Sequence, residues 1–243
     1  MYDLHSHLLP GIDDGAIDLK NALKMAEQAV NCGITHMVCT PHIHIGRFNN
    51  DQASISDALQ KFRKGLEEKT IPLKVAAAAE IRLAAEIIPL VKQKQLPVLG
   101  HWENQEVLLI EFPSDRVPHG AIAMIEWLLD QNYVPMIAHP ERNRGFIERP
   151  ALLDTFLNLG CLTQLTATAI TGQFGTKVKE TAARFLMEDK ITVMASDAHN
   201  IRYRPPVFSE AIKYAKTLVG NEGVEKLLYS NPKKISREKF SGL

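Results

Sequence analysis

The chain has 243 residues, and its 28 basic and 28 acidic side chains give a formal net charge of zero. A neutral chain lacks the electrostatic field that general nucleic-acid binding requires, and no apolar run is long enough to span a membrane. The length suits a single α/β domain with a large core. We therefore expect one domain over residues 1–243, without general nucleic-acid binding or membrane insertion.

Short β-type runs alternate with helical patterns along the whole chain. The β-type runs lie at 2–6, 34–39, 73–79, 107–112, 134–138, 161–166 and 191–195. Helical patterns lie at 18–32, 51–66, 119–131, 175–188 and 205–218. Alternation of this kind predicts parallel strands joined by right-handed helical crossovers, and seven such runs favour a closed or nearly closed barrel over an open sheet.

The cysteines indicate a reducing compartment and exclude one phosphatase chemistry. The three cysteines, Cys32, Cys39 and Cys161, are odd in number and widely spaced, which argues against a disulfide framework. The first residues lack the basic and apolar regions of a signal peptide. We therefore expect a cytoplasmic protein. No cysteine is followed six residues later by arginine, so the nucleophilic Cys-x5-Arg loop of the common tyrosine phosphatases is absent.

Histidines and carboxylates recur where the predicted strands end. In a (β/α) barrel the carboxyl ends of the strands converge on one face, so residues far apart in sequence meet there. His5 and His7 are two apart and point to the same side of an extended chain, and Asp14 follows in a glycine-flanked turn. The predicted cluster consists of His5, His7, Asp14, His42, Glu80, Glu111, His139, Asp197 and His199.

A metal centre explains this cluster better than chance does. A single strand-end histidine or glutamate is usually only a polar loop residue. Five histidines and four carboxylates buried together would be very costly without a cation. Nine ligands exceed the needs of one ion and imply two or three, and the absence of thiolates suits Mn²⁺, Fe²⁺, Zn²⁺ or Mg²⁺. Among the other histidines, His36 is expected to be structural. For His44, which is close to His42, a role in supporting the metal ligands and no role at the site are equally open.

The motifs that carry these residues resemble those of the PHP (polymerase and histidinol phosphatase) superfamily, and in particular its bacterial CpsB/YwqE-type protein-tyrosine phosphatases. The resemblance rests on His5-Ser6-His7-Leu8-Leu9-Pro10-Gly11-Ile12-Asp13-Asp14-Gly15, Thr40-Pro41-His42, Glu80-Ile81, Ile110-Glu111-Phe112, His139-Pro140-Glu141-Arg142 and Ser196-Asp197-Ala198-His199. It implies a distorted (β/α)7 TIM-like barrel with a trinuclear centre, in which Mn²⁺ is the favoured ion and Glu80 is a bridging ligand.

The same resemblance suggests what the protein acts on. It implies a metal-dependent protein-tyrosine phosphatase that acts on the phosphotyrosine tail of a bacterial tyrosine kinase and so regulates capsule or exopolysaccharide synthesis. Arg142 and Arg204 match positions near the substrate, where planar guanidinium groups would hold phosphoryl oxygens. Alternatives are another PHP phosphoesterase, such as a histidinol-phosphate phosphatase or a nuclease, and a metal-binding regulatory module without activity. The zero net charge disfavours the nuclease.

Overall fold

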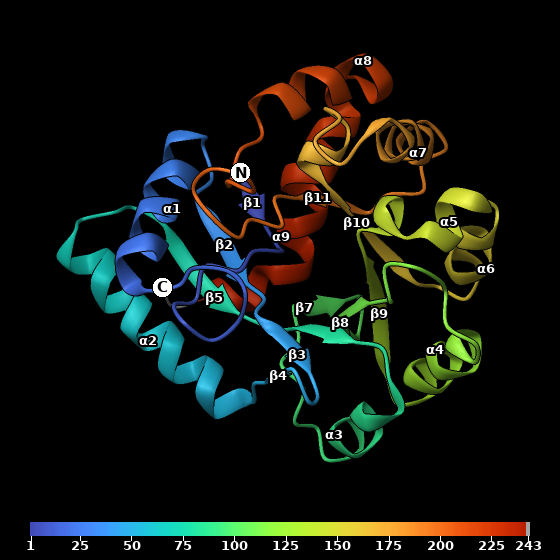
Figure 1. The fold of residues 1–243 in the computed structure, drawn as a ribbon, viewed down its shortest axis with the longest axis horizontal. Coiled ribbons are helices and arrows are strands. Elements are labelled where there is room, and N and C mark those ends of the chain that lie inside the picture. Colours follow the sequence, from blue (N-terminus) through green and yellow to red (C-terminus); the bar gives the residue numbers. More distant parts are fainter. Residues whose placement is uncertain (242–243) are drawn as a thin grey trace.

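The computed structural model describes residues 1–241, in which short strands form the centre and helices surround them (Figure 1). The strands are β1 (Tyr2–Asp3), β2 (His36–Cys39), β3 (His42–His44), β4 (Phe48–Asn49), β5 (Lys74–Ala77), β6 (Glu80–Arg82), β7 (Gly100–Trp102), β8 (Gln105–Glu111), β9 (Tyr133–Ala138), β10 (Leu162–Thr166) and β11 (Val193–Ala195). All seven runs predicted to be strands overlap a strand.

The helices cover the outside of the strands. The α-helices are α1 (Leu19–Asn31), α2 (Gln52–Glu68), α3 (Ile88–Lys92), α4 (Ala121–Asp130), α5 (Arg144–Glu148), α6 (Leu152–Asn158), α7 (Thr176–Met187), α8 (Ser209–Glu225) and α9 (Asn231–Ser236). Short 3-10 or π segments are η1 (Ala85–Ile87), η2 (Pro140–Arg142), η3 (Ala167–Ala169), η4 (Lys226–Ser230) and η5 (Arg237–Phe240). The predicted start of the last long helix at residue 205 is wrong, because two prolines precede a helix that begins at Ser209.

The strands form two sheets that are mostly parallel. One sheet has the order β1-β2-β5, and the other has the order β11-β10-β9-β8-β6-β3-β4 with β7 paired to β8. Only the β3–β4 and β7–β8 pairs are antiparallel among the described residues. The segment after β1 meets the segment after β11 through an isolated parallel bridge between Ser6 and Ala198. These sheets are not closed, so the fold is a mixed α/β fold and the distorted seven-unit barrel stays a prediction.

Alternate residues of the central strands enter two separate apolar clusters. Val107 and Leu109 of β8 pack in a small inner cluster, whereas Leu108 and Ile110 pack in the large cluster beneath the helices. Burial of both faces explains why these strands are nearly continuous apolar runs in the sequence. Ala76 of β5 belongs to the inner cluster, where a small side chain suffices despite its weak strand propensity.

Two of the predicted strands are each followed, after a short break, by a second short strand. The run 34–39 contains β2. The next strand, β3, begins after Pro41, which has no N–H to donate to a ladder. The run 73–79 ends as β5 and resumes as β6 at Glu80. β3 pairs with β6, and β6 pairs in turn with β8, so His42 and Glu80 lie in register in the larger sheet.

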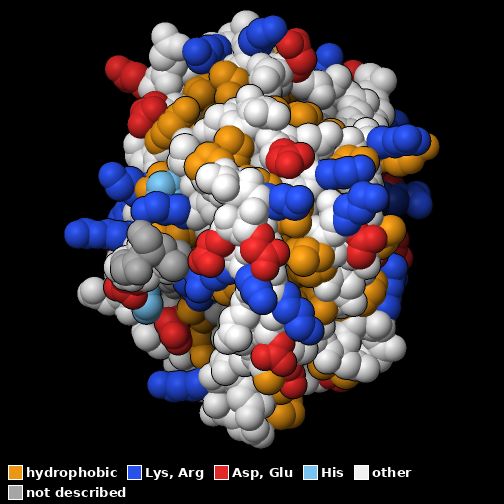
Figure 2. Space-filling model, turned by 90° about the vertical axis from the view of Figure 1, so that its left-hand side faces the viewer, with side chains coloured by type: hydrophobic (Ala, Val, Ile, Leu, Met, Phe, Trp, Pro, Cys, Tyr) orange, Lys and Arg blue, Asp and Glu red, His pale blue; other side chains and the backbone are white. Residues whose placement is uncertain are grey.

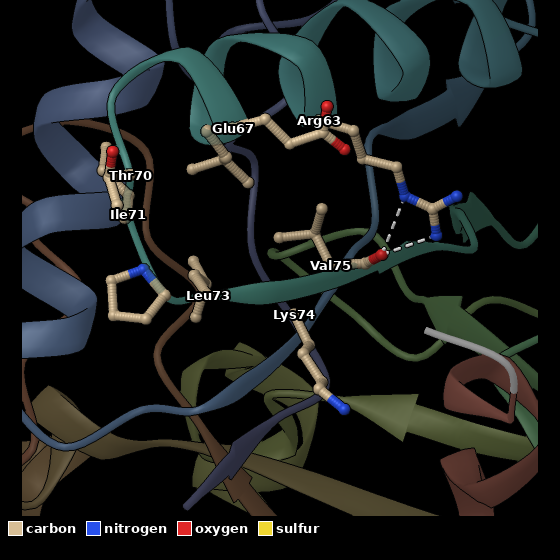
Figure 3. Close-up of a pocket in the computed structure, with 9 residues that line it drawn as sticks. Arg63, Glu67, Thr70, Ile71, Leu73, Lys74 and Val75 are labelled. Carbon is tan, nitrogen blue, oxygen red and sulfur yellow. Dashed lines mark hydrogen bonds between the residues drawn. The ribbon is translucent and has the colours of Figure 1, made fainter.

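The surface carries mixed charges on one face and a hollow between α2 and β5. In the face shown in Figure 2, basic and acidic side chains are interleaved among the described residues. A hollow of about 440 Å³ lies between α2 and β5, but Nε and Nη2 of Arg63 there donate to the Val75 carbonyl at 3.2 and 2.7 Å and so attach the helix to the strand (Figure 3). Within residues 1–241, no helix combines the length and apolar character needed to cross a bilayer.

Candidate metal centre

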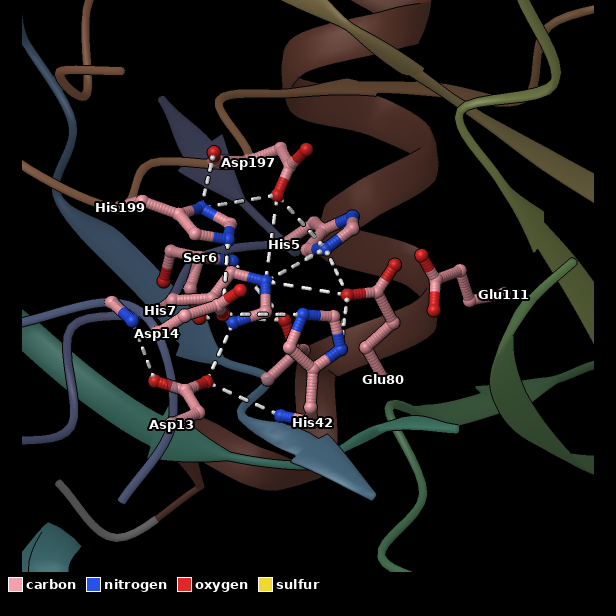
Figure 4. Close-up of polar contacts among 12 residues, drawn as sticks. His5, Ser6, His7, Asp13, Asp14, His42, Glu80, Glu111, Asp197 and His199 are labelled. Carbon is pink, nitrogen blue, oxygen red and sulfur yellow. Dashed lines mark hydrogen bonds and ion pairs between the residues drawn. The ribbon is translucent and has the colours of Figure 1, made fainter. Parts of the chain in front are cut away.

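The structure brings all nine predicted ligands together at one end of the strands (Figure 4 labels eight of them). His42 and Glu80 begin β3 and β6, and Glu111 ends β8. His139 directly follows β9, and the remaining members lie in the segments after β1 and β11. Their ligand atoms form four overlapping groups, each within 4.8 Å: His7, Asp14, His42 and His199; His5, His7 and Glu80; His5, His139 and Asp197; and His42, Glu80 and Glu111.

His5 and His7 face each other across two carboxylate oxygens. Their Nε2 atoms are 3.2 Å apart. Glu80 Oε2 lies 3.2 Å from Nε2 of His5 and 3.3 Å from Nε2 of His7. Asp197 Oδ1 lies 3.3 and 3.4 Å from the same two nitrogens. Ligand atoms around an ion at about 2.1 Å are separated by about 3.0–3.4 Å in octahedral or tetrahedral geometry, so these spacings fit a metal ion.

The other ring nitrogen of His5 and of His7, Nδ1, already has a hydrogen-bond partner. Nδ1 of His7 lies 2.6 Å from Asp13 Oδ2, and Nδ1 of His5 lies 2.7 Å from Gln164 Oε1. Both partners accept, so each Nδ1 carries the donated proton, and a ring with no proton on Nε2 presents its lone pair there. Four acceptor atoms then converge on one point, which is unfavourable unless positive charge lies between them. The donor set therefore fits divalent cations.

Glu80 is the centre of the cluster. Its Oε2 also lies 3.1 Å from Nδ1 of His42, and its Oε1 lies 2.9 Å from Nε2 of His139. Asp14 Oδ1 joins the far side of the cluster, 3.4 Å from Nε2 of His42 and 3.5 Å from Nε2 of His199. Glu80 therefore contacts candidate ligands that belong to different groups.

Electrostatics at the site show the same need for positive charge. Burial opposes ionisation of Glu80, yet His5 and His42 hold its pKa well below the usual range. Burial likewise opposes a charge on His7, yet Asp13 raises the pKa of that ring well above its ordinary value. By contrast, burial lowers the pKa of His139, and burial together with His7 lowers that of His199 to about 4. These two rings are therefore neutral and able to act as ligands near pH 7.

Arg142 and Arg204 both lie at the site and share one partner. Nη1 of Arg142 and Nη2 of Arg204 each donate to Asp197 Oδ2. The other oxygen of Asp197 faces the paired histidines. Arg142 also lies over the ring of Phe174, with its guanidinium carbon 4.6 Å from the ring centroid. Asp197 thus fixes the two guanidinium groups relative to the candidate metal ligands.

Two residues that support the cluster were not predicted from the sequence. Asp13 contacts His7, and it also accepts the backbone N–H groups of His42 at 3.2 Å and Gly15 at 2.9 Å. Gln164 Oε1 contacts His5 and accepts the backbone N–H of His139 at 3.2 Å. Gln164 is the middle residue of β10, whose sequence LTQLT also contains two threonines, so its polarity alone does not distinguish it. Nothing in the local sequence distinguishes Asp13 from Asp14.

A pocket of about 290 Å³ opens above the cluster. Its walls include His44, Arg47 and Phe48 from the β3–β4 hairpin and Arg82 from β6. Arg82 Nη1 donates to Glu111 Oε2 at 3.0 Å. His44 lines this pocket but belongs to none of the four candidate metal groups.

The remaining histidines lie elsewhere. The prediction that His36 is structural is confirmed, because its ring stacks on Tyr2 with centroids 4.3 Å apart. Nδ1 of His101 lies 3.0 Å from Glu238. His119 is exposed in the turn before α4.

Sequence comparison relates the chain to bacterial phosphatases. It is 36% identical over 222 residues to the tyrosine-protein phosphatase YwqE of Bacillus subtilis, covering 91% of this chain and 86% of that protein. It is 28% identical to the tyrosine-protein phosphatase CpsB of Streptococcus pneumoniae, covering 97% of this chain and 98% of that protein.

Structural comparison agrees. A crystal structure described as one of YwqE from B. subtilis and CpsB from S. pneumoniae, "unique metal-dependent tyrosine phosphatases", superposes with a TM-score of 0.90 and 35% identity, covering 98% of this chain and 95% of that one. A β-aspartyl dipeptidase from Fervidobacterium islandicum superposes with a TM-score of 0.54 and 16% identity, covering 96% of this chain and 71% of that one, which shows a shared fold alone. The sequence also matches the family described as "Capsular polysaccharide synthesis, CpsB/CapC" over residues 1–237. The resemblance expected from the motifs is thereby confirmed, and the chain belongs to the CpsB/CapC family.

Proposed function

We propose that this protein is a metal-dependent protein-tyrosine phosphatase that hydrolyses phosphotyrosine on the tail of a bacterial tyrosine kinase and so regulates capsule or exopolysaccharide synthesis. The observation that carries the proposal is the cluster of nine histidines and carboxylates beneath a pocket that contains arginines. Membership of a family whose relatives are named tyrosine-protein phosphatases supports the same reaction. We further propose that residues 1–243 form one cytoplasmic domain with a distorted (β/α)7 barrel; the last two residues of that range lie outside those described.

The proposed ligands are the nine clustered residues, and their four overlapping groups support two or three ions. Mn²⁺ is the ion we favour, and Fe²⁺, Zn²⁺ and Mg²⁺ suit the same nitrogen and oxygen donors. When bound, the ions would supply Lewis-acid chemistry, withdrawing charge from phosphoryl oxygens and lowering the pKa of water. The protein's part is to orient the rings with Nε2 toward the cluster, which Asp13 and Gln164 do for His7 and His5.

Arg142 and Arg204 are proposed to bind the phosphoryl group. Each uses one nitrogen on Asp197, which leaves further N–H donors of the planar fork for substrate oxygens. The charge on those oxygens is dispersed in the transition state, so fixed donors in the pocket lower the barrier. The leaving group is a phenolate whose conjugate acid has a pKa of about 10, so a strong general acid is not required.

Removal and return of metal test this function. Protein dialysed against a chelator should lose hydrolysis of p-nitrophenyl phosphate and of a phosphotyrosine peptide, and Mn²⁺ should restore both. Histidinol phosphate in the same assay tests the alternative phosphoesterase, and we expect a kcat/KM far below that of the peptide. Activity that survives chelation would refute the metal chemistry. A preference for histidinol phosphate over the peptide would refute the assigned substrate.

A further inference from the structure

One wall of the pocket is a braced hairpin. Strands β3 and β4 pair antiparallel through Ile43 with Asn49 and His44 with Phe48. Gly46, with φ of +88°, makes the turn, and its N–H donates to Asn49 Oδ1 at 2.7 Å. The side-chain amide of Asn50 donates to the His42 carbonyl at 2.9 Å and attaches the base of the hairpin. The residues at the hairpin tip are therefore held in place beside the proposed catalytic site.

Arg47 rests on an aromatic stack at this tip. The ring of Phe48 is parallel to that of His42, with 5.4 Å between centroids and 12° between planes. The guanidinium carbon of Arg47 lies 4.9 Å from the centroid of Phe48. A guanidinium on an aromatic face gains a cation–π interaction and loses less entropy when it binds a partner, because it is already oriented.

Arg47 differs from the other arginines that line the pocket. Arg142 and Arg204 are hydrogen-bonded to Asp197 and only 22% and 25% exposed. Arg82 is hydrogen-bonded to Glu111 and 24% exposed. Arg47 is 65% exposed, and the carboxylate oxygen it approaches, on Asp14, is 3.8 Å away, beyond hydrogen-bonding distance. Asp14 is also a member of a candidate metal group, so its charge is needed inside the cluster.

The charges of the pocket leave a place for another anion. Four arginines and four carboxylates line it, so their formal charges cancel: Arg47, Arg82, Arg142 and Arg204 against Asp14, Glu80, Glu111 and Asp197. Each divalent ion adds two positive charges, and a phosphate monoester brings about two negative ones. With two or more ions, the pocket therefore stays positive after the phosphate has bound.

On the basis of the proposed function, we propose that Arg47 is a specificity residue that binds an acidic side chain next to the phosphotyrosine of the substrate peptide. The phosphate enters between Arg142 and Arg204, and the chain that carries it crosses the hairpin tip. A carboxylate there pairs with the one pocket arginine, among the described residues, that has no carboxylate within hydrogen-bonding distance.

The experiment compares phosphotyrosine peptides that differ only in the residues flanking the phosphotyrosine, which are Asp, Asn or Lys on either side. The readouts are kcat/KM with Mn²⁺ present, and the dissociation constant of non-hydrolysable phosphonate versions measured by fluorescence anisotropy. The unmodified protein should prefer an Asp flank over Asn by about two- to fivefold, the range of an exposed ion pair. Arg47→Ala should abolish this preference, and Arg47→Glu should reverse it in favour of Lys. Arg184→Glu, near the end of α7 and outside the pocket, is the matched control and should keep the original preference.

The outcomes separate this inference from the proposed function. Hydrolysis of p-nitrophenyl phosphate by the unmodified protein tests the function alone. Equal handling of Asp and Asn peptides by the unmodified protein would refute the role of Arg47. An Asp preference that persists in Arg47→Glu would also refute it. A loss of the same size on every substrate, including p-nitrophenyl phosphate, would place Arg47 on the phosphate or the metal cluster instead.

Discussion

Asp13→Asn should weaken metal binding although Asp13 is not itself a proposed ligand. The carboxylate accepts on both oxygens: Oδ2 receives His7 Nδ1–H at 2.6 Å and the His42 N–H at 3.2 Å, and Oδ1 receives the Gly15 N–H at 2.9 Å. Asparagine has one acceptor oxygen. If that oxygen faces His7, the amide NH2 faces the Gly15 N–H. If the amide is flipped, the NH2 faces His7 and forces the ring proton onto Nε2, where the metal should bind.

In either orientation of the asparagine amide, the loss of metal affinity can be estimated. Loss of a partner that orients a metal-binding histidine typically lowers metal affinity by about 10- to 100-fold. That factor corresponds to about 1.4–2.7 kcal/mol. Because His5 and His139 also contact Glu80 and have no contact with Asp13, we expect weakened binding and not complete loss.

Competition between the protein and a chromophoric chelator for Mn²⁺ or Zn²⁺ measures this affinity directly. Asp57→Asn on the exposed side of α2 makes the same chemical change away from the site and is the control. Thermal unfolding of the metal-free samples shows whether the fold itself is weakened. Unchanged affinity and ion stoichiometry in Asp13→Asn would show that the Asp13–His7 contact does not support the centre.

Three further predictions follow from the site and the core. Glu80→Gln keeps the side-chain shape but removes the charge shared between candidate groups, so bound metal and phosphatase activity should both be lost; full activity after dialysis against chelator and return of Mn²⁺ would contradict this. Arg142→Ala should lower kcat/KM on an aryl phosphate by about ten- to a thousandfold. Its metal content should stay nearly unchanged, since Arg204 still neutralises Asp197 Oδ2. Arg142→Lys should recover only part of the rate, and metal loss measured in the same samples would make Arg142 a structural residue. Burial raises the pKa of Cys39 and Cys161 to about 12, so an aromatic disulfide reagent at pH 8 should label Cys32 quickly and the other two only after unfolding; fast labelling of all three would contradict their burial.

The sequence was sufficient to predict that the candidate ligands cluster, because one rule places the ends of the strands that carry them. Parallel strands joined by helices place their carboxyl ends on one side, and each proposed ligand follows or ends such a run, apart from Asp14 in its turn. The rule needs only the order of the runs and not their exact limits. His42 and Glu80 accordingly lie in the cluster, although each belongs to a separate short strand after an interruption that the pattern did not predict.

The contacts around the ligands could not be predicted in the same way. They depend on which atoms meet across strands, and spacing along the chain does not encode this. Arg82 pairs with Glu111 because β6 and β8 are in parallel register there. Gln164 reaches both His5 and His139 from β10, more than twenty residues from either. Closure of the barrel is another property of pairing between distant strands, and it remains a prediction here.

Asp197 connects the two halves of the proposed mechanism. One of its oxygens faces the paired histidines, and the other holds both arginines proposed to bind phosphate. Its pKa is held well below the usual range, against the effect of burial, by His5, Arg142 and Arg204. A carboxylate that serves cations on both sides couples them, because moving it toward one set weakens its bonds to the other. Metal-free protein should therefore lose affinity for a phosphonate in part through displaced arginines, so Arg142→Ala should weaken phosphonate binding less in metal-free than in metal-loaded protein. Equal losses in both forms would show that the arginines and the metal cluster act independently.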